Sequence, residues 1–538
     1  MWRNAKNALR LLRAAYVLAQ YEALFPLDLL RERPFGLRAL IGVAKFTAKT
    51  VAVFSPKKLH PASEDVLRLS QALAALGPAY IKLGQFLATR PDIIGSSLAD
   101  DLKLLQDRLP PFGLAEARRL LASELGEKSV PLLAALKAPI AAASIAQVHA
   151  VEVISQDGSP RKLAVKILRL DVEMHIARDL ESFFWVAQWL ENHLPISRRL
   201  RPVAAVQTLA ESLAMETDLR LEAAAMTEMQ IATRQDADFN VPDIAWDMTA
   251  QRVLTSSFVD GISVSDRDAL VSAGHHMPTL ATKLIQIFLT HALRDGFFHA
   301  DMHPGNLFVD ASGRFVAVDF GIMGRLDGTT RRFLAEVLMG FIRRDYHHVA
   351  RIHFSAGFVP AEKSVGAFAQ ALRAIGEPIM GRPADEISMA RLLGQLFQVT
   401  AQFSMPLQPQ LLLLQKTMVV VEGVARHLDP HNNIWLSAEP VLRRFMQEKL
   451  GPEGRLAEAA EGAMAFGRAV SGLPALLERA EQGTRALHEM LAEGGLKLHP
   501  ATTEMLAKDN AKRLRHTRLA LWLAALALIL VLYQLFFG

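Results

Sequence analysis

Residues 297–321 constrain the fold of this chain more strongly than any other stretch. Two apolar runs flank a turn at 312–313, a pattern that predicts a buried β-hairpin. Three polar side chains stand at the ends of these runs: Asp301, Asn306 five residues later, and Asp319 eighteen residues after Asp301. The hairpin therefore holds two carboxylates and one carboxamide at a fixed spacing.

Phosphoryl transfer requires a set of groups of this kind. One carboxylate orients the nucleophile or accepts its proton, while a carboxamide and a second carboxylate hold Mg²⁺ against the phosphates. The order His-x-Asp, Asn, Asp-Phe-Gly is the signature of the catalytic and metal loops of protein-kinase-like folds. Each part alone is weak, since a lone Asp-Phe-Gly is usually a turn. The complete order predicts a kinase-like site.

The composition excludes several classes of site. The chain has 538 residues, enough for more than one domain, and 51% of them are hydrophobic. It contains no cysteine, which excludes disulfides, thiolate metal sites and a cysteine nucleophile. Its net charge of +5 is too small to indicate a nucleic-acid partner, and we expect none.

Both ends of the chain suggest a membrane. Residues 519–537 carry no charge, are long enough for one membrane-spanning helix, and follow a basic segment that places the bulk of the protein on the cytoplasmic side. A buried core helix is the alternative, but a basic flank has no reason to lie inside a globule. The first 40 residues are basic and carry no acid before Glu22. They fit an amphipathic helix on an anionic membrane surface or a basic helix packed on the protein itself.

A helix is predicted at residues 64–89, with a restart at Pro78, where proline is tolerated. Lys82 and Gln85 are three residues apart and therefore share one face of this helix. On its own, the pattern would describe an ordinary amphipathic helix with a solvated polar face.

A loop of small residues precedes a predicted hairpin. Residues 141–144 read Ala-Ala-Ala-Ser, strands are predicted at 148–154 and 163–168, and Lys166 stands in the returning strand. Kinase folds cover and bind ATP phosphates at this place, although here the glycine-rich loop is absent. Alanine disfavours positive φ, so the loop should be stiffer. Alternatively, Lys166 is a strand lysine whose ammonium reaches solvent.

Residues 209–229 form a strongly helical stretch with several acids. Asp218 and Glu222 are four apart and are expected to share a face, with Glu216 just upstream. One of these acids should pair with Lys166, as the helix C glutamate does in kinases. A solvated acidic face is the alternative.

Other segments complete an α+β pattern. Residues 113–137 and 278–294 predict helices, and 252–261 predict a strand that runs into a glycine turn, a candidate hinge between lobes. After Gly321 the chain is predicted to be mostly helical to about residue 500.

Taken together, these motifs resemble those of the UbiB family of atypical kinase-like proteins, over roughly residues 60–440. The combination of a KxGQ motif, an alanine-rich loop and an ExD motif is highly specific to that family. The matching residues are Lys82 and Gln85 (KxGQ), Ala141, Ala142, Ala143 and Ser144 (alanine-rich loop), Glu216 and Asp218 (ExD), Lys166, Glu222, Asp301, Asn306 and Asp319.

The resemblance implies a role for each catalytic side chain. Lys166 would bind nucleotide phosphates and pair with Glu222. Asn306 and Asp319 would hold Mg²⁺, and Asp301 would occupy the position of the catalytic base.

The resemblance also implies that a helix occludes the site. Lys82 and Gln85 would meet the acids Glu216 and Asp218 and occlude the cleft where a protein substrate would enter. The alanine-rich loop, residues 141–144, would alter nucleotide selectivity.

The function implied is support of ubiquinone biosynthesis at the bacterial inner membrane, with ATP and Mg²⁺ as cofactors. ATP binding or hydrolysis would be coupled to the handling of polyprenylated phenol and quinone precursors, or of the enzymes that act on them, rather than to protein phosphorylation. Two alternatives stay open: a non-catalytic nucleotide-binding scaffold for lipid-modifying enzymes, and a small-molecule phosphotransferase.

Three features depart from the family pattern. The usual Pro-Gly after Lys166 is missing, Ala225 stands where the family often has Asn, and one C-terminal span is predicted where bacterial relatives commonly have two.

We therefore predict an α+β, bilobal protein-kinase-like fold with a helical N-terminal extension and a C-terminal transmembrane helix. The predicted parts are the N-terminal extension at 1–110, the N-lobe at 111–260, the C-lobe at 261–450, a helical tail at 451–518 and the transmembrane helix at 519–537.

Overall fold

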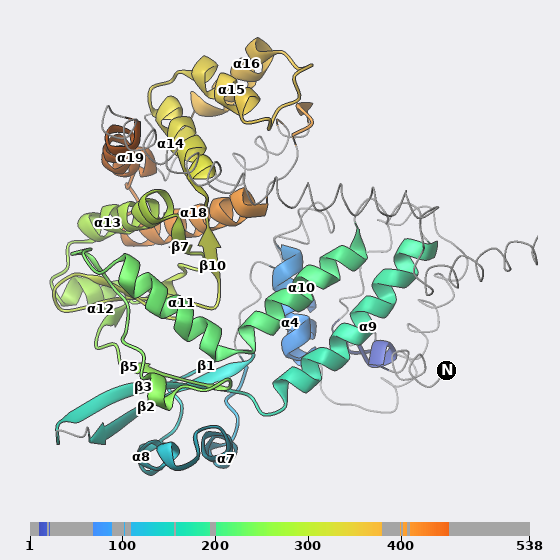
Figure 1. Cartoon of the computed structure of the whole chain (residues 1–538), viewed down its shortest axis with the longest axis vertical. Coiled ribbons are helices and arrows are strands. Elements are labelled where there is room, and N and C mark those ends of the chain that lie inside the picture. Colours follow the sequence, from blue (N-terminus) through green and yellow to red (C-terminus); the bar gives the residue numbers. More distant parts are fainter. Residues whose placement is uncertain are drawn as a thin grey trace, which may run out of the picture. The chain divides into compact units, whose positions relative to one another are not determined.

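The computed structural model describes most of the chain between residues 68 and 450 (Figure 1). The described residues are 68–88, 109–154, 158–193, 201–378, 402–405 and 409–450, with positions 10–14, 16–18, 21, 102 and 399. Residues 1–447 and 448–538 form two separate compact units. The predicted tail at 451–518 and the apolar run at 519–537 lie outside the described residues. Among the helices described, none is long and apolar enough to cross a membrane.

Two helices on either side of Gly77 confirm the predicted restart at Pro78. Helix α3 (Arg68–Leu76) ends before Gly77, whose φ of +111° suits glycine, and α4 (Pro78–Ala88) begins directly after it. Ala79 and Ile81 of α4 are buried in the main core. Helix α4 therefore packs as part of the folded body and carries Lys82 and Gln85 with it.

An antiparallel sheet follows, with strand order β1-β2-β3-β5. Its strands are β1 (Ala141–Ala142), β2 (Ala146–Ile154), β3 (Pro160–Leu168) and β5 (Val253–Ser257). The predicted strands are confirmed. Because side chains alternate along a strand, Val165 and Ile167 are buried on the face opposite Lys166.

Two helices cover that face, α7 (Leu114–Leu125) and α8 (Val130–Ala135), and they share a hydrophobic cluster with β2 and β3 (Figure 1). The prediction of one helix over 113–137 was wrong at its centre. Gly126 adopts φ +56° at the end of α7, and a 3₁₀ turn over Gly126–Ser129 leads into α8. A left-handed glycine ends a helix, which the apolar periodicity alone did not reveal.

Three helices lie between β3 and β5 in the sequence: α9 (Val172–His193), α10 (Pro202–Glu216) and α11 (Leu219–Ala232). The predicted continuous helix at 209–229 is therefore two helices. Asp218 is the N-cap of α11 and accepts a hydrogen bond from the Arg220 N–H, so it ends one helix and starts the next.

The predicted catalytic hairpin is confirmed by β8 (Leu307–Val309) and β9 (Phe315–Ala317), which pair antiparallel. They form a second sheet, of order β4-β9-β8-β6, with β4 (Phe239–Asn240) and β6 (Ile262–Ser263). The chain passes from β5 of the first sheet to β6 of the second through residues 258–261, where the hinge was expected. Strand β7 (Phe297–His299) pairs with β10 (Met323–Arg325).

Helices surround these short strands. Helix α13 (Met277–Thr290) continues as a π-helix over His291–Asp295 and ends at Gly296 (φ +66°), which confirms the predicted apolar helix. Within the described residues, the helices after the loop of Asp319 are α14 (Gly328–Ile342), α15 (Tyr346–Ser355), α16 (Val365–Gly376), α18 (Pro409–Leu428) and α19 (Ile434–Leu450). Helix α18 packs along α13 (Figure 1), and both contribute to the main core.

The close pairing of β10 with β7 generates a first prediction. Gly324 lies opposite Phe298, and a methyl group at Gly324 would overlap the buried ring of Phe298. We expect Gly324→Ala to lower the free energy of unfolding by about 1–3 kcal/mol, measured as a lower thermal midpoint. The control is Gly423→Ala in α18, where no atom lies within 4 Å of the added methyl group, and the midpoint should hold or rise. An unchanged midpoint in Gly324→Ala would contradict this packing.

Candidate active site

An ion pair between β3 and α11 lies at the centre of the site. The Nζ atom of Lys166 lies 2.7 Å and 2.8 Å from the two carboxylate oxygens of Glu222. The side chains are 16% and 8% exposed, so the pair is largely shielded from water. The prediction that one acid of this stretch pairs with Lys166 is confirmed, and the acid is Glu222.

Asp319 joins this pair from the loop after β9. Its Oδ1 lies 3.1 Å from Lys166 Nζ, and the next backbone N–H, of Phe320, donates to Glu222 Oε1 at 3.2 Å. Asp319 has a φ of +61°, a left-handed conformation that aspartate adopts more readily than most residues. Its carboxylate is 47% exposed, whereas Glu222 is buried. One lysine is therefore shared by a buried and an accessible carboxylate.

The charges in this cluster shift all three pKa values. Burial alone would lower the pKa of Lys166, but Asp319 and Glu222 outweigh it and raise that pKa. Burial raises the pKa of Glu222 to about 7, Asp319 adds to the rise, and Lys166 opposes it. Partial burial would raise the pKa of Asp319, but the ammonium of Lys166 holds it well below its ordinary range. Asp319 therefore stays ionised at all physiological pH values.

The loop after β7 brings Asp301 and Asn306 together. Asn306 Nδ2 donates to the backbone carbonyl of Asp301 at 3.1 Å and lies 3.4 Å from its Oδ2. With its nitrogen engaged, the Oδ1 of Asn306 is available as an acceptor. His303 Nε2 lies 3.7 Å from the carboxylate of Asp301.

His299 supports this loop from the core. Its Nδ1 accepts the backbone N–H of Asp301 at 3.1 Å, and its Nε2 lies 3.3 Å from the carbonyl oxygen of Val318. Since a carbonyl only accepts, the proton is on Nε2. Burial lowers the pKa of His299, which agrees with this neutral tautomer. One buried imidazole thus joins the loops that carry Asp301 and Asp319.

Thr417 supports the same loop and was not predicted from the sequence. This buried residue of α18 places its Oγ1 3.1 Å from the carbonyl oxygen of Ala300 and 2.8 Å from that of Leu413 in its own helix. The hydroxyl is shared between the two acceptors. Ala300 lies between His299 and Asp301, so α18 contacts the catalytic loop directly.

Of the residues expected to occlude the site, Lys82 and Glu216 contact each other, whereas Asp218 has another partner. Lys82 Nζ lies 2.7 Å from Glu216 Oε2, and the charge of Lys82 also lowers the pKa of Asp319. Asp218 caps α11 and pairs with Arg220 at 2.6 Å. Gln85 lies three residues after Lys82 on α4 and is partly buried. The expected contact of α4 with an ExD acid is confirmed for Glu216.

The alanine-rich loop is partly a strand. Ala141 and Ala142 form β1 and pair with Val148 and Gln147 of β2, and the Ala143 N–H donates to the Ala146 carbonyl at 2.7 Å. Ser144, at the turn, is fully buried. Backbone pairing, and not only the choice of alanine, therefore restricts this loop.

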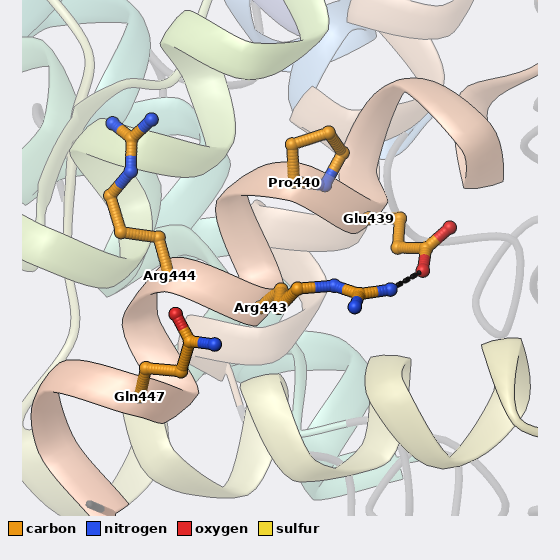
Figure 2. A pocket seen from close by; sticks show the side chains of 5 residues that line it. All are labelled: Glu439, Pro440, Arg443, Arg444 and Gln447. Carbon is orange, nitrogen blue, oxygen red and sulfur yellow. Dashed lines mark hydrogen bonds and ion pairs between the residues drawn. The ribbon is translucent and has the colours of Figure 1, made fainter.

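The donor set fits Mg²⁺ and a nucleotide. Mg²⁺ prefers carboxylate and carbonyl oxygens and is commonly shared between one or two protein groups and substrate phosphates. The ionised, accessible carboxylate of Asp319 and the Oδ1 of Asn306 meet that requirement, and Lys166 supplies a positive charge for phosphate. A separate hollow is lined by Glu439, Pro440, Arg443, Arg444 and Gln447 of α19 and includes none of these residues (Figure 2).

Comparisons with known proteins agree with this geometry. The model of the ABC1 atypical kinase-like domain matches residues 104–353, and that of the UbiB helical domain matches residues 372–433. A protein of Marinobacter nauticus named "Probable protein kinase UbiB" is 37% identical over 535 residues, which cover 97% of this chain and 93% of that protein. The chain belongs to the UbiB family.

Other relatives of this UbiB-family chain extend the comparison. A protein of Xanthomonas euvesicatoria pv. vesicatoria with the same name is 37% identical over 475 residues, 86% of this chain and 84% of that protein. A solved structure titled "The complex structure of Rv3197-erythromycin from Mycobacterium tuberculosis" aligns with 75% of this chain and 98% of that one, at 22% identity and a TM-score of 0.49. The domain that holds Lys166, Glu222 and Asp319 is an atypical kinase-like domain of α+β fold, and the helical-domain match includes α18 and Thr417.

The raised pKa of Glu222 predicts an unusual pH dependence. Because this carboxyl binds its proton more tightly in the folded state (pKa about 7) than in the unfolded state (4.5), its contribution to stability is complete below pH 4.5 and is lost as pH rises through 7. Relative to Glu222→Gln, which stays neutral, the wild type should lose stability as pH rises through this window, at a rate on the order of 1 kcal/mol per pH unit. Thermal midpoints of both proteins at pH 5, 6 and 7 measure the difference.

Glu228→Gln, in the same helix, is the control. Arg325 lowers the pKa of Glu228, so its contribution is lost only as pH falls below the ordinary carboxyl range. The wild type should not lose stability relative to this variant between pH 5 and 7. A constant difference between wild type and Glu222→Gln would refute the raised pKa.

Proposed function

We propose that this protein is a membrane-associated, Mg-ATP-dependent ATPase of the atypical kinase type that supports ubiquinone biosynthesis. The observation that carries the proposal is the position of Lys166, whose ammonium lies within hydrogen-bonding distance of both Glu222 and Asp319. These three side chains adjoin a loop that holds Asp301 and Asn306. Family membership supports the same site chemistry.

Each side chain has a proposed role. Lys166 binds nucleotide phosphates, and Glu222 holds the lysine in place. Asn306 and Asp319 hold Mg²⁺, which when bound neutralises charge on the phosphates. Asp301 orients a water molecule and accepts its proton as the bond from the water oxygen to the γ-phosphorus forms and the bond to the bridging oxygen breaks, releasing ADP and phosphate.

The surroundings of the site favour water or a small acceptor over a protein. Lys82 of α4 is paired with Glu216, and its charge also acts on Asp319, the proposed metal ligand. A protein segment that approaches Asp301 from that side would have to displace this ion pair, in which both side chains are 10–12% exposed. We therefore propose that protein phosphorylation is not the activity.

The lipid part of the proposal rests on the sequence ends. An apolar run at 519–537 after a basic segment suits a helix that anchors the protein in the bacterial inner membrane with the site on the cytoplasmic side. An ATPase held there would act on membrane-dissolved polyprenylated phenols and quinones, or on the enzymes that modify them. The proposed lobes, 111–260 and 261–450, both contribute residues to the site.

A non-catalytic nucleotide-binding scaffold is the second candidate. Two observations favour it: the ion pair between Lys82 and Glu216, and the pairing of Ala141 and Ala142 with β2, which limits movement of the loop. Such a scaffold would bind Mg-ATP and organise lipid-modifying enzymes without turnover. A phosphorylated small molecule would instead indicate a phosphotransferase.

ATP hydrolysis tests the leading proposal. We expect wild-type turnover to rise with anionic liposomes and a phenolic precursor mimic, and to fall at least about 100-fold in Asp319→Asn, because the neutral amide binds Mg²⁺ poorly. Asp260→Asn, an exposed aspartate paired with Lys162, should leave turnover unchanged. Normal turnover in Asp319→Asn would refute the site, and nucleotide binding without turnover in every condition would favour the scaffold.

Deletion of residues 519–538 tests the anchor. The truncated protein should move from the membrane pellet to the supernatant on ultracentrifugation, because the apolar run supplies the proposed insertion energy. A second truncation that also removes residues 1–40 separates the two ends. If the first variant stays in the pellet and the double variant does not, the basic N-terminal segment also binds the membrane.

A further inference from the structure

Arg169 lies beside the turn of the alanine-rich loop (residues 141–144). It follows directly after β3, the strand that carries Lys166. Its backbone N–H donates to the carbonyl oxygen of Ile145 at 2.8 Å, and its Nη2 donates to that of Ala143 at 3.0 Å. These two carbonyls flank Ser144, so Arg169 binds the loop on both sides of its turn.

The same guanidinium also reaches the segment before α7. Arg169 Nη2 donates to the carbonyl oxygen of Pro110 at 2.8 Å, and its carbon Cζ lies 5.6 Å from the centre of the Phe112 ring. Nη2 carries two hydrogens, so Ala143 and Pro110 each receive one. Arg169 therefore links the loop to residues 110–112.

Gln147 makes a second link between the same parts. It is the cross-strand partner of Ala142, and its buried side chain accepts from the Phe112 N–H at 2.9 Å. Its Nε2 lies 2.9 Å from His149 Nε2. His149 Nδ1 is 2.7 Å from the Lys137 carbonyl oxygen, so Nδ1 holds the proton and His149 Nε2 accepts from Gln147. Gln147 and His149 of β2 thus connect the strand that pairs with the loop to Phe112 and Lys137 through hydrogen bonds.

We propose that Arg169 is a positioning residue that fixes the alanine-rich loop relative to Lys166, three residues earlier in the same chain, and so pre-orders the loop for a nucleotide. This inference rests on the proposed function, in which that loop covers the phosphates. A glycine-rich loop can change its backbone conformation when a nucleotide binds. This loop is already ordered without a nucleotide, by its contacts with Arg169 and Gln147. Without Arg169, nucleotide binding has to order the loop, which weakens affinity.

The test compares Arg169→Met with Arg252→Met. Methionine keeps an unbranched side chain but removes the guanidinium. Arg252 is a matched control near the same sheet, where its guanidinium contacts Glu173 at 2.6 Å instead of the loop. Two quantities are measured for the full-length protein: hydrogen exchange of peptides that cover residues 138–149, and the Kd values of Mg-ATP and Mg-ADP by calorimetry.

Arg169→Met should exchange faster at 138–149 and raise both Kd values about three- to tenfold, which corresponds to the net contribution of one ordinary hydrogen bond. Arg252→Met should change neither quantity, even if its thermal midpoint falls. Arg169→Lys, which keeps the charge but not the flat guanidinium, should give a smaller change in the same direction. This variant replaces Arg169→Met if the latter does not fold.

Unchanged exchange at 138–149 in the Arg169 variants would overturn the inference. Faster exchange with unchanged Kd values would overturn the link from loop order to nucleotide binding. Wild-type protein that binds no nucleotide would refute the proposed function instead, and the exchange measurement would then still decide whether Arg169 orders the loop.

Discussion

The buried contact of Lys166 with Glu222 is the interaction on which the arrangement of the site depends. Removing both charges from water is unfavourable, and the pair is stable only because its geometry is good and other hydrogen bonds complete it. The two short contacts and the Phe320 N–H meet that condition. A strand, a helix and the loop after β9 must therefore be correctly placed together, which makes the site sensitive to changes in any of the three.

Two further helices, α4 and α18, act on the same site. Helix α4 approaches through Lys82, whose charge acts on Asp319, and α18 approaches through Thr417, whose hydroxyl contacts the loop of Asp301. Both helices lie outside the short strands that carry the catalytic motif, yet both belong to the main core. A change in either helix thus has a physical route to the proposed metal residue or to the proposed base.

The sequence was sufficient to predict elements and contacts where the spacing of a motif or the alternation of a strand is strict. The hairpin of β8 and β9, the alternation around Lys166 and its pairing with an acid at 216–222 could all be predicted, because two-residue periodicity and motif order leave few choices. Prediction from the sequence failed where a break of a few residues interrupts a helical pattern, at Gly126 and at Thr217-Asp218. The contacts of Arg169 with Ala143 and of Thr417 with Ala300 could not be assigned, because each joins a side chain to a backbone carbonyl more than 20 residues away and carbonyls have no sequence signature.

The difference in exposure between Glu222 and Asp319 separates their proposed roles. Both carboxylates contact the same ammonium group, but Glu222 is 8% exposed and Asp319 is 47% exposed. The more accessible carboxylate is also the one whose pKa is held low and whose charge is retained, which suits it to hold a cation. Glu222 keeps its position because the Phe320 N–H and Lys166 both hold it. Under the proposed function, Asp319 would hold the metal ion, while Glu222 would keep Lys166 in position for the phosphates.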